Sequence, residues 1–188
     1  KEQEVPITAA IGPIDTSKVV YEGRLIGKDL DKSIQQVIQG MLQRTNVLKE
    51  VIILDTVALE GKRLDPEQVL AAARAKNADV LLVGEVKEFL AEPKGMFGSE
   101  YRVTLRLQTQ LFNAHSGSLV WKKTERVMVE KAGELDQIVL HVAMPSLNAG
   151  LLPPLVDHIQ TDYTVLQRAQ VSALSTLTRR ATIASPPG

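Results

Sequence analysis

The chain has 188 residues, of which 44% are apolar and 23% charged, and its 22 basic residues balance 22 acidic ones. Such a composition is typical of a folded soluble protein, and the length suits one domain with an additional segment. The formal charge of zero excludes a whole-chain attraction to nucleic acid or to an anionic membrane, and the absence of cysteine excludes disulfides, thiolate metal sites and a cysteine nucleophile.

Two features of the chain bear on its location. No apolar run approaches the roughly 18–20 residues that cross a bilayer as a helix, so we expect a soluble chain. The sequence begins KEQEVP without a methionine, which indicates a processed form whose targeting segment is absent. The lack of cysteine fits the cytosol, and it fits equally a periplasmic lipoprotein whose acylated cysteine preceded Lys1.

The first half of the chain predicts two units of a strand followed by a helix. A β-branched strand over Val5–Asp15 ends after Gly12-Pro13, and apolar residues at helical spacing follow Asp29, a plausible N-cap. The apolar run Glu50–Thr56 predicts a buried strand. Asp65 and the Pro that follows it then open an alanine-rich helix that reaches about Lys76.

The next part of the chain predicts three consecutive strands. Ala78–Phe89 begins apolar on both faces, as is typical of a strand in the centre of a sheet. A glycine-rich loop over Pro93–Ser99 precedes Tyr101–Phe112, in which apolar and polar residues alternate. Ser118–Glu130 is its expected partner strand, so these two segments predict a hairpin with one core face and one solvated face.

His115 and Ser116 lie side by side between these last two strands, where they could belong either to a hydrolase site or to a turn. A hydrolase site needs a base near the serine, a group that orients the base and an oxyanion hole, and no G-x-S-x-G motif is present. The segment from Asn113 to Gly117 has the length and the glycine of a hairpin turn. The sequence therefore favours the turn, and no catalytic residue is predicted.

The remaining residues give no support for a metal, a nucleotide or another cofactor. His141 and His158 lie outside any spacing typical of metal ligands. The segment at Gly27-Lys28 lacks the other residues of a phosphate-binding loop, and no G-x-G-x-x-G is present.

Basic residues gather on the predicted polar face of the hairpin. Arg102 and Arg106 lie on one strand, and Lys122 and Arg126 lie on the next. These four residues are the predicted partner or anion surface, and the competing interpretation is an ordinary solvated face with interleaved glutamates. Because aromatic residues make up only 4% of the chain, we expect no nucleic-acid partner.

The end of the chain predicts further helices. An amphipathic helix follows Glu130 until Met144-Pro145, where the proline is expected to interrupt it. We therefore predict an α/β domain over residues 5–150 and a C-terminal helical extension with a disordered end over residues 151–188.

The element order predicts the fold class. Strand, helix, strand, helix, three strands and a helix indicate an α/β (α+β) protein. We expect a mixed sheet of about five strands, two crossover helices, a C-terminal meander and further C-terminal helices.

Two segments carry a resemblance to a known group of proteins. AKNADVLLVGEV and LFNAHSGSLVWKKTERV resemble the core of bacterial envelope proteins that include the TolB N-terminal domain, CsgG, PelC and LpoB. The matching positions are Ala78, Asp79, Gly84, Val86, Asn113, Ser116, Gly117, Val120 and Trp121. The resemblance covers about residues 5–145.

The resemblance implies a non-enzymatic periplasmic role. It predicts an adaptor or ring subunit of an export or envelope-assembly machine, tethered to the outer membrane through a lipid on a lost N-terminal residue. The expected partners are an envelope protein, a second copy of the chain or an exported polymer, without a cofactor. A subunit of a flagellar or pilus-associated ring and a hydrolase of unknown substrate remain the alternatives.

Overall fold

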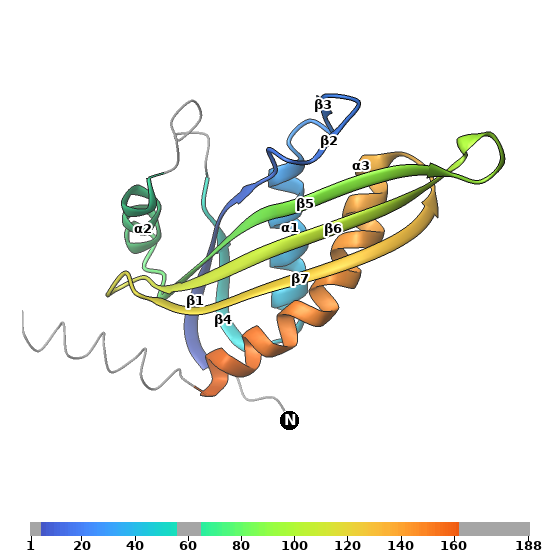
Figure 1. Cartoon of the computed structure of the whole chain (residues 1–188). Helices are drawn as coiled ribbons and strands as arrows, with labels where there is room; N and C mark the ends of the chain where they lie inside the picture. Colours follow the sequence, from blue (N-terminus) through green and yellow to red (C-terminus); the bar gives the residue numbers. More distant parts are fainter. Residues whose placement is uncertain (1–4, 56–64, 162–188) are drawn as a thin grey trace, which may run out of the picture.

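The computed structural model describes residues 5–55 and 65–161 as a single layered body (Figure 1). Its strands are β1 (Val5–Asp15), β2 (Val20–Tyr21), β3 (Arg24–Leu25), β4 (Leu48–Ile53), β5 (Val80–Lys94), β6 (Glu100–Asn113) and β7 (Leu119–Ala132). Its helices are α1 (Leu30–Arg44), α2 (Pro66–Ala75) and a long C-terminal helix, Leu135–Thr161, which begins as α3 (Leu135–Ile138).

A five-stranded mixed sheet organises the molecule. Its strand order is β4-β1-β5-β6-β7, in which β1 lies parallel to both β4 and β5 while β5, β6 and β7 form an antiparallel meander. The predicted fold class is confirmed, and β5 lies inside the sheet as its two apolar faces indicate. The small β2–β3 hairpin is an addition that the sequence did not predict.

The capping residues of the two crossover helices behave differently. Asp65 accepts a hydrogen bond from the Glu67 N–H at 3.1 Å through its side chain, and Pro66 occupies the first turn, as predicted. Asp29 precedes α1 in a left-handed conformation (φ 56°) and makes no side-chain capping bond. Only its carbonyl contributes, accepting from the Ser33 N–H at 3.1 Å.

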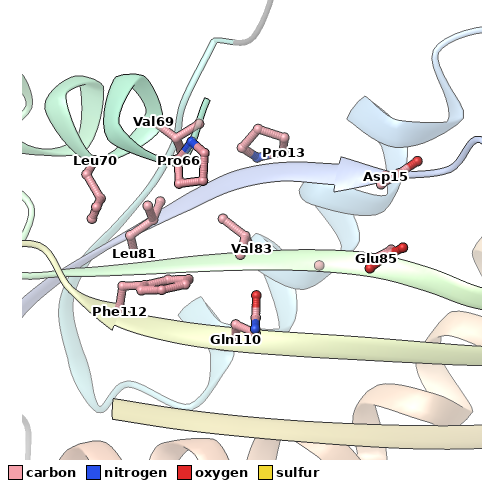
Figure 2. A pocket seen from close by; sticks show the side chains of 11 residues that line it. Pro13, Asp15, Pro66, Val69, Leu70, Leu81, Val83, Glu85, Gln110 and Phe112 are labelled. Carbon is pink, nitrogen blue, oxygen red and sulfur yellow. The ribbon is translucent and has the colours of Figure 1, made fainter. Parts of the chain in front are cut away.

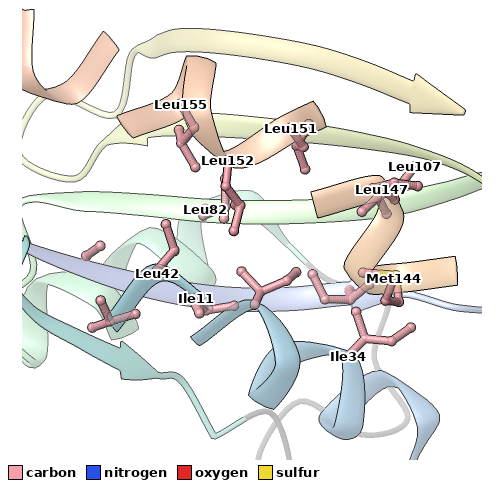
Figure 3. Packing of buried hydrophobic residues seen from close by; sticks show 14 of the residues in the cluster. Ile11, Ile34, Leu42, Leu82, Leu107, Met144, Leu147, Leu151, Leu152 and Leu155 are labelled. Atoms are coloured by element: carbon pink, nitrogen blue, oxygen red, sulfur yellow. The ribbon is translucent and has the colours of Figure 1, made fainter. Parts of the chain in front are cut away.

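One face of the sheet, here called the inner face, carries the main hydrophobic core. Helix α1 and the C-terminal helix both pack on this face, as Figure 3 shows for Ile34, Met144 and Leu147 beside Ile11 and Leu107. The β6 side chains that point into this core, including Leu105, are essentially inaccessible to solvent. Burial of side chains of this size contributes roughly 1.5–3 kcal/mol each.

The opposite face, here called the outer face, is covered only at one end. Helix α2 packs there through Val69, Leu70 and Ala73 against Leu81 and Phe112. In Figure 1 this helix lies at the end of the meander near the β6–β7 turn. No other helix in the described part of the chain covers the outer face, so most of the meander presents it to solvent.

The predicted helix break at Met144-Pro145 is wrong. The helix continues to Thr161 because a wider π-helical turn, Val139–Ala143, precedes the proline. In that turn the Met144 N–H donates to the Val139 carbonyl oxygen five residues back. Such a turn shifts the hydrogen-bond pattern just before a residue that has no N–H to donate.

The C-terminal helix also crosses Gly150, where the predicted domain ends. Beyond that position its apolar side chains recur at helical spacing and belong to the main core: Leu151, Leu152, Leu155, Val156 and Ile159. Residues 151–161 therefore pack as part of the domain. The predicted disordered end lies outside the described residues.

This helix is long and apolar enough to span a membrane by length and composition, and its most apolar 18-residue window has a mean hydropathy of 1.4. Half of its most apolar window is buried inside the protein. The structure accounts for the apolar residues by their packing on the inner face of the sheet.

Candidate interaction surface

The turn between β6 and β7 is fixed by a polar cluster around Asp79, which directly precedes β5. One Asp79 carboxylate oxygen accepts from the Thr8 N–H at 2.9 Å, and the other lies 3.0 Å from His115 Nε2. The Asp79 carbonyl oxygen also accepts from the Ala114 N–H at 2.9 Å. Asp79 therefore ties β1 to the β6–β7 turn.

Asn113 shapes the same turn from within. Its side-chain oxygen accepts from the N–H groups of His115 and Ser116, at 2.9 and 3.2 Å. Gly117 then takes a positive φ of 77°, which a glycine adopts without steric cost. The turn predicted between the two strands is confirmed.

The geometry of His115 and Ser116 does not form a nucleophile and its base. Ser116 Oγ lies 2.7 Å from Ser118 Oγ, whereas the ring nitrogen of His115 bonds to Asp79. A hydrolytic serine needs its hydroxyl within hydrogen-bond reach of the base. The two residues hold the turn together, and the structure offers them no shared chemistry.

The four predicted basic residues all lie on the outer face of the meander. Strand pairing places Arg106 directly opposite Arg126, and Gln110 directly opposite Lys122. Arg102 lies further along β6, opposite Glu130. The hairpin register therefore gathers the four side chains on one surface, as the alternation of the sequence predicts.

Arg102 and Arg106 are neutralised by neighbouring glutamates. Arg102 lies 2.7 Å from the Glu130 carboxylate and 3.8 Å from that of Glu92. Arg106 lies 3.7 Å from the Glu88 carboxylate. Because these acids come from the adjacent strands β5 and β7, both arginines belong to a mixed ion-pair network that extends across the meander.

Lys122 and Arg126 differ from the other two. Both are exposed, and neither makes an ion pair with any residue in the described part of the chain. Both lie on β7, the last strand of the sheet. The positive charge that remains available for a partner therefore lies along the β7 edge. The sequence alone does not show that the basic residues of β7 differ in this way from those of β6.

A pocket of about 290 Å³ opens on the outer face beside α2 (Figure 2). Leu81, Val83 and Phe112 form an apolar wall, and Asp15 and Glu85 place carboxylates toward one end. The sequence did not predict this pocket, because its lining comes from β1, α2, β5 and β6 and forms no local motif. Only the parallel pairing of β1 with β5 brings Asp15 beside Glu85.

The remaining histidines form no site in the described residues. His141 is exposed on the C-terminal helix, and no three His, Asp or Glu side chains gather as metal ligands within residues 5–55 and 65–161.

The geometry defines an α+β domain whose long antiparallel meander has one buried face and one largely open face. No family model matches the chain, and no curated protein matches it in sequence. Solved structures do share its fold. The PelC dodecamer from Paraburkholderia phytofirmans matches with a TM-score of 0.52 and 20% identity over 82% of this chain and 91% of PelC.

Two further structures match over similar lengths. A DUF330 protein from Xanthomonas campestris gives a TM-score of 0.57 at 12% identity, over 87% of this chain and 91% of its own. Lipoprotein GNA1162 from Neisseria meningitidis gives a TM-score of 0.51 at 10% identity, over 81% of this chain and 99% of its own. The predicted resemblance to the group that contains PelC is thereby confirmed for the fold.

Proposed function

We propose that this protein is a non-enzymatic subunit of a bacterial envelope assembly, acting as a ring subunit or adaptor for export or envelope construction. The observation that carries the proposal is the fold shared with the PelC dodecamer over most of both chains. The likeness to a protein named as a lipoprotein supports a periplasmic location with a lipid tether at the outer membrane.

The open outer face supplies a surface for such a role. Lys122 and Arg126 are cations of this face that make no ion pair with another described residue, while Arg102 and Arg106 add a partly neutralised flank. We propose that this surface binds an acidic group of a partner protein or of an exported polymer. Coulomb attraction at such an exposed surface is screened by salt within about 10 Å at 0.1 M ionic strength.

The mass in solution tests the assembly. Light scattering after size exclusion would be measured on the full chain and on a chain that ends at Thr161, which keeps the whole described core. A defined oligomer in both supports a ring subunit assembled through the domain. An oligomer that needs residues 162–188 assigns assembly to that segment, and a monomer at all concentrations excludes the ring subunit.

Charge reversal tests the surface. Lys122→Glu combined with Arg126→Glu removes the unpaired cations without breaking an ion pair seen in the described residues. We expect partner binding to fall at least tenfold and to lose its salt dependence. Lys18→Glu, an exposed residue on the loop between β1 and β2 and outside the four-residue basic surface, is the matched control. Unchanged binding by the double variant would contradict the assignment.

A further inference from the structure

Within residues 5–55 and 65–161, strand β7 is an edge of the sheet with a regular free side. Among these residues it pairs with β6 alone, in an unbroken register from Glu100↔Ala132 to Leu111↔Trp121. Lys123 directs its carbonyl oxygen toward β6, where it accepts from Thr109 Oγ1 at 3.2 Å. Because backbone groups alternate sides along a strand, those of Thr124, Arg126, Met128 and Glu130 point away from β6.

An exposed edge of this length is a template for another strand. Proteins commonly protect such edges with charged side chains, and β7 carries charges of both signs. The order of those charges therefore decides which strand the edge would accept or repel.

The sequence around Met128 is self-complementary. It reads ERVMVEK from Glu125 to Lys131, so that positions equally distant from Met128 carry Val and Val, Arg and Glu, and Glu and Lys. An antiparallel copy of this strand, related by a two-fold axis at Met128, places Arg126 opposite Glu130 of the copy. The same axis places Glu125 opposite Lys131 of the copy.

The two charge pairs lie on opposite faces of such a ribbon. Arg126 and Glu130 belong to the outer face with Met128, whereas Glu125 and Lys131 belong to the inner face with the valines. Directly opposed charges of unlike sign stabilise a strand pair by roughly 0.2–1 kcal/mol each, and like charges destabilise it.

Placing the two-fold axis at a neighbouring residue gives less favourable charge pairs between the two strands. A two-fold axis at Arg126 or at Glu130 opposes a charge to its own copy, and an axis at Val127 opposes Lys123 to Lys131. An axis at Val129 forms no opposed ion pair between the strands. Charge complementarity thus selects the axis at Met128.

The described protomer leaves the required groups available. Arg126 and Lys131 make no ion pair within residues 5–55 and 65–161. Met128 is 58% exposed, so its side chain is accessible to a second copy. Glu130 and Glu125 each hold one cation, Arg102 at 2.7 Å and Lys123 at 3.3 Å, and a carboxylate accepts more than one donor.

We propose that the β7 edge binds the β7 edge of a second copy, antiparallel and centred on Met128, so that two five-stranded sheets join into one. This deepens the proposed function by taking the acidic partner of Arg126 to be Glu130 of a second copy, and it rests on the proposed assembly. The contact is isologous and closes after two copies, so a larger ring would need a further interface.

Cysteine substitution tests the axis directly, because the chain contains no cysteine. In the proposed pair, position 128 faces its own copy with Cα atoms about 5.5 Å apart, within the range of a disulfide. Met128→Cys should therefore form a covalent dimer on mild oxidation of the full chain. Thr124→Cys is the matched control, since its two copies would lie roughly 27 Å apart along the ribbon.

Charge reversal with rescue tests the register. Arg126→Glu opposes two carboxylates at two places and should weaken dimerisation at least tenfold in sedimentation or light scattering. Adding Glu130→Arg restores opposite charges across the axis and should recover the dimer. Circular dichroism of each variant shows whether the fold is retained after the loss of the Arg102 contact.

The outcomes separate the two proposals. Suppose that the chain is oligomeric but that Met128→Cys forms no more covalent dimer than Thr124→Cys does. That result overturns the edge pairing and leaves the proposed assembly standing. A chain that is monomeric throughout overturns the edge pairing and the ring subunit together.

Discussion

The two faces of the β5–β6–β7 meander arise from one alternating sequence pattern, but one face is buried and the other is largely exposed. On the inner face, Leu105, Leu107 and Leu111 are buried against the C-terminal helix and α1. On the outer face, Arg106 and Arg126 remain exposed next to each other. The inner face therefore carries stability, and the outer face is free to carry recognition.

The difference lies in what covers each face. The C-terminal helix supplies a continuous apolar surface for the inner face, whereas α2 reaches only the end of the outer face near Phe112. A strand pattern that alternates cleanly predicts one buried face, but the extent of its cover depends on helices distant in sequence.

Ending the chain at Gly150 should have the largest effect. It removes Leu151, Leu152, Leu155, Val156 and Ile159 from the inner core. At roughly 1.5–3 kcal/mol for each buried side chain, the loss is comparable to the roughly 5–15 kcal/mol stability of a whole domain. We expect no cooperative thermal unfolding by circular dichroism. The chain ending at Thr161 is the control, and equal stability of both would contradict the core assignment.

Leu107→Ala should destabilise the protein by about 2–5 kcal/mol, because it leaves a cavity in the inner core. The matched variant on the outer face is Leu90→Ala, where the side chain is 48% exposed, and it should stay within about 0.5 kcal/mol of the parent. Chemical denaturation measures both. Similar losses in the two variants would abolish the distinction between the faces.

Asp79→Ala should cost about 1–3 kcal/mol, since it leaves the Thr8 N–H without its acceptor and frees the His115 ring. His115→Ala removes only the second of these bonds and should cost less. Denaturation of both variants checks the order. A larger loss in the histidine variant would mean that the ring, and not the Asp79 clamp on β1, anchors the turn.

Arg102→Ala should have the smallest resolvable effect, at most about 1 kcal/mol, because exposed ion pairs contribute little and are screened by salt. Arg126→Ala removes no ion pair within the described protomer and should leave its unfolding free energy unchanged. Measurements at low protein concentration and at two salt concentrations separate the two. Equal, salt-independent losses would show that Arg102 stabilises by packing.

The sequence by itself determined the elements whose signals are local. The Asp65-Pro66 cap, the alternation in β6 and the turn between Asn113 and Gly117 each depend on neighbouring residues, and each was predicted correctly. These signals also sufficed to predict the fold class and the resemblance to the PelC group.

Only the tertiary structure decided how distant segments combine. It replaced the expected break at Pro145 with a π-helical turn, because the apolar residues beyond the proline gain burial against the sheet. It also divided the predicted basic surface, since the β5 and β7 glutamates neutralise Arg102 and Arg106 while Lys122 and Arg126 remain at the edge. The sequence contains the charges and the alternation of apolar and polar residues, but which charges lie close together depends on strand order and register.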